Sequence, residues 1–238
     1  MDELNKESIC EIRYRLDSLE GYINLKPENA IDEKKDFAYR WYAGALHSKG
    51  FYLHMLGYQE ESEKVFNQVI PCTRKALNYC NHHIRESETQ NLLFERALLF
   101  GSPEQAIESA KIISSMGITE ALLSHYYLIL ANLFIENISE VEKLLPELQK
   151  LENKKYLTQI KLGTVRAVEA LCARDINEFG AALSGVIYKH IHQIRYLREA
   201  MSLENLVSFP SVLLCIIALK FDIEAKPLVS NSIYSAKT

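Results

Sequence analysis

Seven histidines are the first residues of this chain that could carry chemistry, as metal ligands or as acid–base groups. One helix chelates zinc when two histidines lie four residues apart on the same face, and no two histidines here have that spacing. His47 and His54 lie seven residues apart and could share a face, but no HExxH motif or paired cysteine accompanies them. We therefore expect no metal and no cofactor. His190 continues an apolar stripe, so we expect it to be a core histidine.

Motifs for nucleophilic catalysis and phosphate binding are also missing from the sequence. It contains no GxSxG, no GxxxxGK[ST] and no GxGxxG motif, and no strand pattern that would hold one. The five cysteines include no CxxC pair and lie in or beside apolar helical patterns, so we expect buried, reduced thiols. We expect that the chain is not an enzyme. An enzyme would instead need a deep pocket joining carboxylates with several histidines, among them His47, His54, His125 and His190.

Acidic residues are the first candidate contacts for a protein partner. Five of them should open two successive helices, where carboxylates also interact favourably with the helix dipole: Glu60, Glu61, Glu63, Glu86 and Glu88. A solvated helix start is the simpler interpretation. The functional interpretation is a surface for a basic partner, because complementary charge speeds encounter and selects partners.

An aromatic segment is the second candidate contact. Tyr39, Trp41 and Tyr42 surround Arg40, and this composition is typical of residues that dominate binding energy at interfaces. Packing inside a helical stack is the other interpretation, since most of the 13 tyrosines must serve it.

Composition and charge exclude several classes of function. The chain has 238 residues with 48% hydrophobic and 24% charged, which is typical of a folded globular protein, and its 9 Gly and 6 Pro are too few for a turn-rich β fold. The net charge of −4 arises in residues 1–119, which hold 14 basic and 18 acidic residues; residues 120–238 hold 13 of each. Without a dense basic region, nucleic-acid binding is not expected. The N-terminus shows no secretory signal and no apolar run is long enough to span a bilayer, so we expect a cytoplasmic protein without membrane contact.

The elements that must position these residues are predicted to be helices. Four sites have the spacing of a capping box or a close relative, and so predict helix starts: Ser87, Ser102, Ser139 and Asp175, each followed three residues later by an acid or amide. Gly101 and Gly117 stand where left-handed C-terminal caps would fall. Residues 121–135 are apolar nearly all round, as expected of a helix packed on several sides. Pro71 and Pro146 fall inside continuing apolar stripes, which predicts kinks there and no helix end.

Helix junctions recur at a nearly regular spacing. Their turn markers are separated by 36 to 47 residues, close to the period of tetratricopeptide-like or HEAT-like helix pairs: Gly57, Gly101, Asn137, Asp175 and Asp222. The prediction is an all-α fold of about ten helices stacked as antiparallel hairpins, a tetratricopeptide/HEAT-like α-solenoid in which residues 1–238 form a single domain.

Two segments resemble the bacterial immunity protein 49 family, whose members are encoded beside polymorphic or contact-delivered toxins. The first is Gly101, Ser102, Pro103 and Glu104 before an Ala-rich helix; the second is Arg198, Asn205, Leu206, Val207, Phe209 and Pro210 before an apolar helix. The resemblance implies an immunity protein that binds and neutralises a cognate toxin domain by occlusion. It does not assign these motif residues to the toxin interface. The acidic first half of the chain would then be part of the binding surface.

A tetratricopeptide-like scaffold or peptide-sensing module is the alternative function. Asn, Lys or Arg at matching positions of successive repeats would favour it, because they would line a peptide-binding groove. The positions after the junctions hold acids instead: Glu60, Glu104, Glu140 and Glu178.

Overall fold

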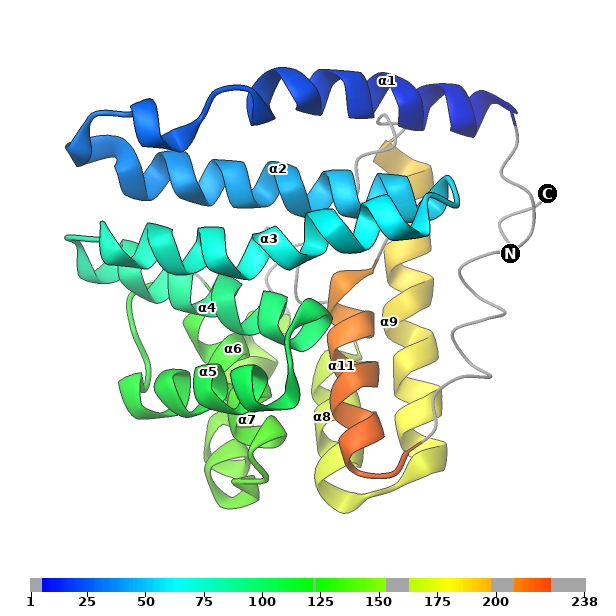
Figure 1. The fold of residues 1–238 in the computed structure, drawn as a ribbon. Coiled ribbons are helices and arrows are strands. Elements are labelled where there is room, and N and C mark those ends of the chain that lie inside the picture. The colour runs from blue at the N-terminus through cyan, green and yellow to red at the C-terminus, as the bar shows by residue number, and fades with distance from the viewer. Residues whose placement is uncertain (1–5, 122, 153–162, 198–207, 224–238) are drawn as a thin grey trace. The chain divides into compact units, whose positions relative to one another are not determined.

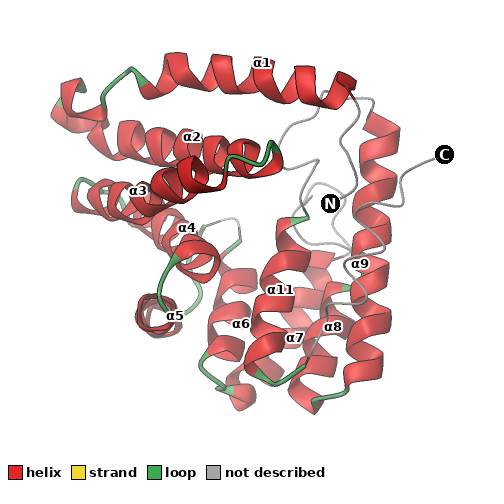
Figure 2. Ribbon diagram, turned by 45° about the vertical axis from the view of Figure 1, so that its right-hand side comes forward, coloured by secondary structure: helices red, strands yellow, loops and turns green. Residues whose placement is uncertain are grey.

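The computed structural model describes residues 6–121, 123–152, 163–197 and 208–223. These residues form ten α-helices and two short 3-10 helices, with no strand among them, which confirms the predicted all-α fold (Figure 2). The chain divides into two compact units: unit 1 comprises residues 1–109 and 119–122, and unit 2 comprises residues 110–118 and 123–238. A single domain over 1–238 stays a prediction.

Unit 1 is a row of antiparallel helices in which each of the first four helices packs on its neighbour in sequence (Figure 1). Its elements are α1 (Lys6–Ile23), η1 (Pro27–Asn29), η2 (Asp32–Lys34), α2 (Lys35–Met55), α3 (Gln59–Asn78), α4 (His83–Phe100) and the first half of α5 (Pro103–Met116). The α2–α3 hairpin is the closest pair: the ring of Phe66 lies against Gly50, where no side chain intervenes. Phe66 also stacks on Phe100, with centroids 4.2 Å apart and planes at 14°. Aromatic packing therefore joins α2, α3 and the end of α4.

Unit 2 contains α6 (Ser124–Phe134), α7 (Ile138–Glu152), α8 (Thr164–Ala173), α9 (Ile176–Leu197) and α11 (Phe209–Lys220). Every residue of α6 from Tyr126 to Phe134 is buried, as the apolar pattern predicted. Consecutive helices pack on one another, which confirms the hairpin stacking. In addition α11 contacts α6 as well as α8 and α9, so helices distant in sequence share one core.

Four helix ends share one backbone pattern. Each ends in a left-handed residue whose N–H binds the carbonyl three residues earlier, while the next N–H binds the carbonyl five residues before it; this is the Schellman cap. The left-handed residues are Gly57, Glu136, Arg174 and Asp222, with φ of 86°, 61°, 54° and 59°. Each lies at or directly before a predicted turn marker. The recurrence supports the solenoid-like assignment of the fold.

The end of α4 departs from this pattern. Gly101 has φ −86° and ψ 173°, which is extended backbone, so the predicted left-handed cap is wrong there. Ser102 must start α5 immediately, and its backbone and side chain pair reciprocally with Gln105 in the predicted capping box. Gly117, after α5, does adopt the left-handed conformation with φ 65°.

The other predicted helix starts had mixed outcomes. Asp175 caps α9 by accepting a hydrogen bond from the Glu178 N–H at 3.0 Å, as expected. Ser87 is wrong as a helix start: it is buried inside α4, which begins four residues earlier, and bonds to Thr119 at 2.6 Å. Ser139 already lies inside α7, and its hydroxyl donates to the Asn137 side chain at 3.4 Å.

Two prolines lie inside helices, as the sequence predicted. Helix α3 continues through Pro71 and α7 continues through Pro146, so neither proline ends its helix.

Among the helices that the structure describes, none combines the length and the apolar character needed to cross a bilayer.

Candidate protein-binding site

Three exposed aromatic rings meet where the end of α1 lies against α2. Phe37 and Trp41 are one helical turn apart in α2 and therefore share a face. Trp41 lies 5.8 Å from Phe37 and 6.1 Å from Tyr22 of α1, between ring centroids. Tyr22, Phe37 and Trp41 are 55%, 51% and 56% exposed, although packing usually covers such residues. We call these three residues the aromatic cluster.

Tyr39, predicted to join Trp41 at a binding surface, is instead a core residue. Positions 39 and 41 are about 200° apart on a helix at 3.6 residues per turn, so the two side chains leave α2 in nearly opposite directions. Tyr39 is only 4% exposed, stacks on Tyr79 at 5.7 Å with planes 4° apart, and donates its hydroxyl to Glu28 at 3.3 Å. Burial, then the Glu28 carboxylate, raises the pKa of Tyr39. Tyr42 is half-buried, and burial likewise raises its pKa.

Two lysines complete this stack and anchor the connection between α1 and α2. Lys35 Nζ lies 5.2 Å from the Tyr79 ring centroid, and Lys75 Nζ lies 5.5 Å from that of Tyr39. Lys35 also pairs with Asp32 of η2 at 2.6 Å, and this hydrogen bond is the main reason that its pKa is raised. The stack therefore holds the backbone that leads into Phe37 and Trp41.

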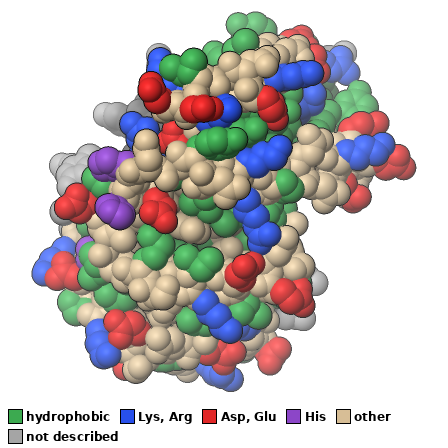
Figure 3. Space-filling model, turned by 60° about the vertical axis from the view of Figure 1, so that its left-hand side comes forward, with side chains coloured by type: hydrophobic (Ala, Val, Ile, Leu, Met, Phe, Trp, Pro, Cys, Tyr) green, Lys and Arg blue, Asp and Glu red, His purple; other side chains and the backbone are tan. Residues whose placement is uncertain are grey.

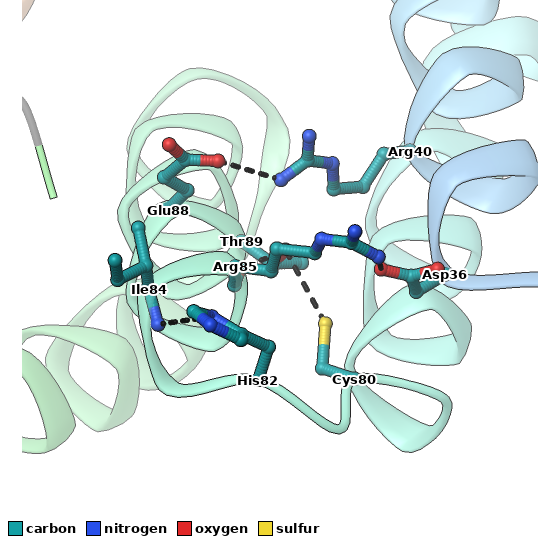
Figure 4. Close-up of polar contacts among 8 residues, drawn as sticks. All are labelled: Asp36, Arg40, Cys80, His82, Ile84, Arg85, Glu88 and Thr89. Atoms are coloured by element: carbon teal, nitrogen blue, oxygen red, sulfur yellow. Dashed lines mark hydrogen bonds and ion pairs between the residues drawn. The ribbon is translucent and has the colours of Figure 1, made fainter. Parts of the chain in front are cut away.

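Arg40, the other predicted contact in this segment, belongs to an ion-pair network between α2 and α4 (Figure 4). Its guanidinium lies 2.9 Å from the Glu88 carboxylate, and Arg85 of α4 lies 3.2 Å from the buried carboxylate of Asp36. Figure 4 shows the two pairs one above the other, with Arg85 extending from α4 to Asp36 and Arg40 extending from α2 to Glu88. Arg40 and Glu88 satisfy each other, so a partner that used either residue would first have to break that pair.

The start of α4 carries a cap that the sequence did not suggest. His82 Nδ1 accepts a hydrogen bond from the Ile84 N–H at 3.3 Å, and the Cys80 thiol, in the connection before α4, lies 3.7 Å from the hydroxyl of Thr89 in α4 (Figure 4). Glu86 lies 3.9 Å from the His83 ring. Histidine can cap a helix through a neutral ring nitrogen, but the usual capping residues are Ser, Thr, Asp and Asn, which is why this start was missed.

The predicted acidic residues form two separate groups. Glu60, Glu61 and Glu63 are exposed in the first turns of α3 and make no ion pair with another described residue. Because α3 and α4 are antiparallel, these residues and Glu88 lie toward opposite ends of the hairpin, separated by roughly 20 Å at 1.5 Å per residue. On the face drawn in Figure 3, acidic and basic side chains are interspersed. Contact of Glu60, Glu61 and Glu63 with a basic partner stays a prediction.

His47 lies inside α2 and His190 inside α9. His47 is packed edge-on against Phe51 and Phe100, and burial, reinforced by the Arg96 charge, lowers its pKa to about 3. The His47 ring is therefore neutral at physiological pH. His190 is buried in α9, as its place in an apolar stripe predicted. Among the described residues, no group of three or more His, Cys, Asp or Glu side chains could hold a metal ion.

The cysteines are free thiols with different environments. Burial raises the pKa of Cys172 and Cys215 to about 11, which lowers the thiolate population at neutral pH. Cys10 is exposed on α1, so the prediction of buried thiols is wrong at this position, and the other four thiols are only half-buried: Cys72, Cys80, Cys172 and Cys215. An exposed position on an edge helix has an apolar neighbour in sequence but no helix covering it, which the local pattern does not reveal.

Comparison with known proteins adds no further assignment. No family model matches the chain, and no curated protein or solved structure is significantly similar to it. Of the two segments that resemble the immunity protein 49 family, Arg198, Asn205, Leu206 and Val207 lie outside the described residues.

Proposed function

We propose that this protein binds a bacterial toxin domain and neutralises it by covering the active site or the path of its substrate. The observation that supports protein binding is the aromatic cluster, three large rings that remain half exposed on α1 and α2. Exposed apolar patches rimmed by polar residues mark interaction sites, and Trp and Tyr are the residues that contribute most at such sites.

The helical scaffold suits this role because it is formed before the partner arrives. Trp41 is held between two other rings, and the stack of Tyr39 and Tyr79 fixes the connection that precedes it. A preformed surface loses little conformational entropy on docking. Neutralisation by occlusion requires neither a catalytic group nor a cofactor.

The identity of the partner as a toxin rests on the resemblance to the immunity protein 49 family. The motif residues themselves serve the fold: Ser102 caps α5, and Pro210 occupies the first turn of α11. We therefore place the toxin contact on the aromatic cluster and not on the motif.

Co-expression with the C-terminal domain of the toxin encoded beside this gene tests the proposal. The protein should restore growth and co-purify with the toxin domain, whereas an unrelated helical protein expressed at the same level should do neither. Continued toxicity together with failure to co-purify would refute the pairing.

A repeat scaffold that binds peptides is the second candidate, favoured by the recurrent caps at Glu136, Arg174 and Asp222. Such a module would bind short, extended peptides in isolation. An immunity protein would bind the folded toxin domain and lose affinity when that domain is unfolded, so the two functions are separated by one binding assay with folded and denatured toxin.

A further inference from the structure

Further exposed apolar residues lie close in sequence to the aromatic cluster. Two aliphatic residues of the connection between α1 and α2, Leu25 and Ile31, are 71% and 61% exposed. With roughly 200 Å² for a whole large apolar side chain, the five residues expose roughly 600 Å². A standard interface buries about 800 Å² on each partner, of which about 60% is apolar, or roughly 500 Å². Together the five residues therefore expose about as much apolar area as one stable interface uses on each partner.

The charges around the cluster do not select a charged partner. Those nearest in sequence are paired within the protein: Glu20 with Lys49 at 3.2 Å, and Asp32 with Lys35 at 2.6 Å. Exposed charges of α1 and the connection that make no ion pair with a described residue have both signs: Arg13, Asp17, Lys26, Glu33 and Lys34. Charge complementarity requires a clear excess of one sign, whereas this set comprises three basic and two acidic side chains. Mixed polar residues around an apolar centre are instead the usual rim of an interface.

We infer that the aromatic cluster takes an apolar anchor, an aliphatic or aromatic side chain presented by a folded partner protein, and not a basic segment. This inference rests on the proposed function, since the partner we assign is the toxin domain. The centre of the interface is then the aromatic cluster and not the acidic residues Glu60, Glu61 and Glu63.

Trp41 makes a direct test possible because it is the only tryptophan of the chain. Incorporation of 5-fluorotryptophan gives a single ¹⁹F resonance that reports the cluster alone, whatever residues the partner contains. Titration with the unlabelled toxin domain encoded beside the gene should shift this resonance and reduce its solvent isotope effect, as the indole leaves water.

Substitutions measure the contribution of the cluster. Trp41→Ala and Phe37→Ala should each weaken toxin binding, with Trp41→Ala reaching roughly 30-fold, the effect of an interface hot spot. Both residues are half exposed, and circular dichroism checks that the variants fold. Tyr58→Ala is the matched control, because Tyr58 is 47% exposed but follows the far end of α2, roughly 20 Å beyond Trp41 along the helix. Charge reversal by Glu61→Lys should leave affinity unchanged, and raising the salt concentration should alter the wild-type affinity less than about threefold.

Three results would overturn the inference while leaving the proposed function intact. In the first, the toxin complex forms but the ¹⁹F resonance does not move. In the second, Glu61→Lys and added salt weaken toxin binding while Trp41→Ala does not. In the third, sedimentation shows a dimer of this chain that Trp41→Ala dissociates, which would assign the cluster to a second copy. A wild-type protein that neither rescues growth nor binds the toxin domain would instead refute the proposed function, and the inference with it.

Discussion

Gly50 lies where the Phe66 ring of α3 approaches the backbone of α2 closely. We therefore expect a substitution at Gly50 to lower stability, although helix propensity alone predicts the opposite. A Cβ at Gly50 would lie 2.6 Å from Phe66 Cδ1, with Cε1 closer still. Carbon atoms in contact prefer separations of about 3.5 Å or more, so the ring would have to move by roughly 1 Å. It is restrained by stacking on Phe100 at 4.2 Å and by the edge contact with Phe51 at 5.3 Å.

The expected magnitude follows from two opposing effects. Replacing Gly by Ala inside a helix gains about 1 kcal/mol from propensity, while overpacking a filled core costs about 1–3 kcal/mol. We expect Gly50→Ala to lower the free energy of unfolding by about 1–2 kcal/mol, because the clash involves a ring held on two sides. Gly44→Ala, in the same helix, should raise it by about 0.5–1 kcal/mol. There the nearest atom to a new Cβ is Arg96 Nη2 at 4.0 Å, so nothing offsets the gain.

Urea unfolding followed by the fluorescence of Trp41 measures both variants within α2, and far-UV circular dichroism provides an independent signal. The midpoint for Gly50→Ala should fall below that of the wild type and the midpoint for Gly44→Ala should rise above it. A Gly50→Ala protein as stable as Gly44→Ala would refute the close approach of α2 and α3 at Phe66.

Three further predictions concern side chains away from the cluster. In thermal unfolding, Lys220→Met should lower the free energy of unfolding by about 1–2 kcal/mol, because it removes a charged hydrogen bond to the Phe134 carbonyl at the end of α6. The control Lys111→Met, at an exposed position of α5, should change it by less than about 0.5 kcal/mol. His47 has a folded pKa of about 3, below its ordinary 6.5, so the unfolded state binds the proton more tightly. Stability is therefore complete above the ordinary pKa and falls with pH below it, at about 1.4 kcal/mol per pH unit. Urea unfolding from about pH 7 to about pH 5 should show a shallower loss for His47→Phe than for the wild type; parallel curves would contradict the burial of this ring. Maleimide should label exposed Cys10 before Cys215, whose pKa is raised to about 11, as followed by peptide mass spectrometry; equal rates would contradict their placement.

Local sequence signals predicted the fold class because helix caps and apolar stripes act within one or two turns. Asp175 and Ser102 cap as expected, since each has its partner three residues away. Ser87 has the same spacing to Gln90 but lies inside α4, because the histidine cap at His82 starts that helix earlier. Capping spacing alone cannot decide between two nearby starts.

The candidate site was predicted only in part, for a reason that lies in tertiary packing. Trp41 was selected from its composition, but Tyr39 was selected with it although helical periodicity places the two on opposite sides of α2. Tyr22 and Phe37, which complete the cluster, were missed. Phe37 could have been found from its spacing of four to Trp41, whereas the contact with Tyr22 depends on how α1 docks and has no local signal.

The ion pairs between α2 and α4 likewise could not be predicted from local sequence patterns. Asp36 and Arg85 are 49 residues apart in sequence, and Arg40 and Glu88 are 48 apart. Arg40 and Glu88 were each predicted to contact a partner protein, and no local pattern pairs them with each other. Only the tertiary packing shows that Glu88 is paired with Arg40, whereas Glu60 makes no ion pair with a described residue.

The junctions at Glu136, Arg174 and Asp222 give unit 2 an electrical polarity. Lys220 donates to the Phe134 carbonyl, Arg174 pairs with Glu136 at 3.6 Å, and its guanidinium lies 5.5 Å from the Phe221 ring, so the C-terminal ends of α6, α8 and α11 meet. Parallel helices add their macrodipoles, each equivalent to about half a negative charge at that end. Lys220 and Arg174 supply two cations at this end, and both also form ion pairs with the Glu136 carboxylate. The two cations therefore reduce the negative potential that three helix ends and Glu136 would otherwise concentrate at this junction.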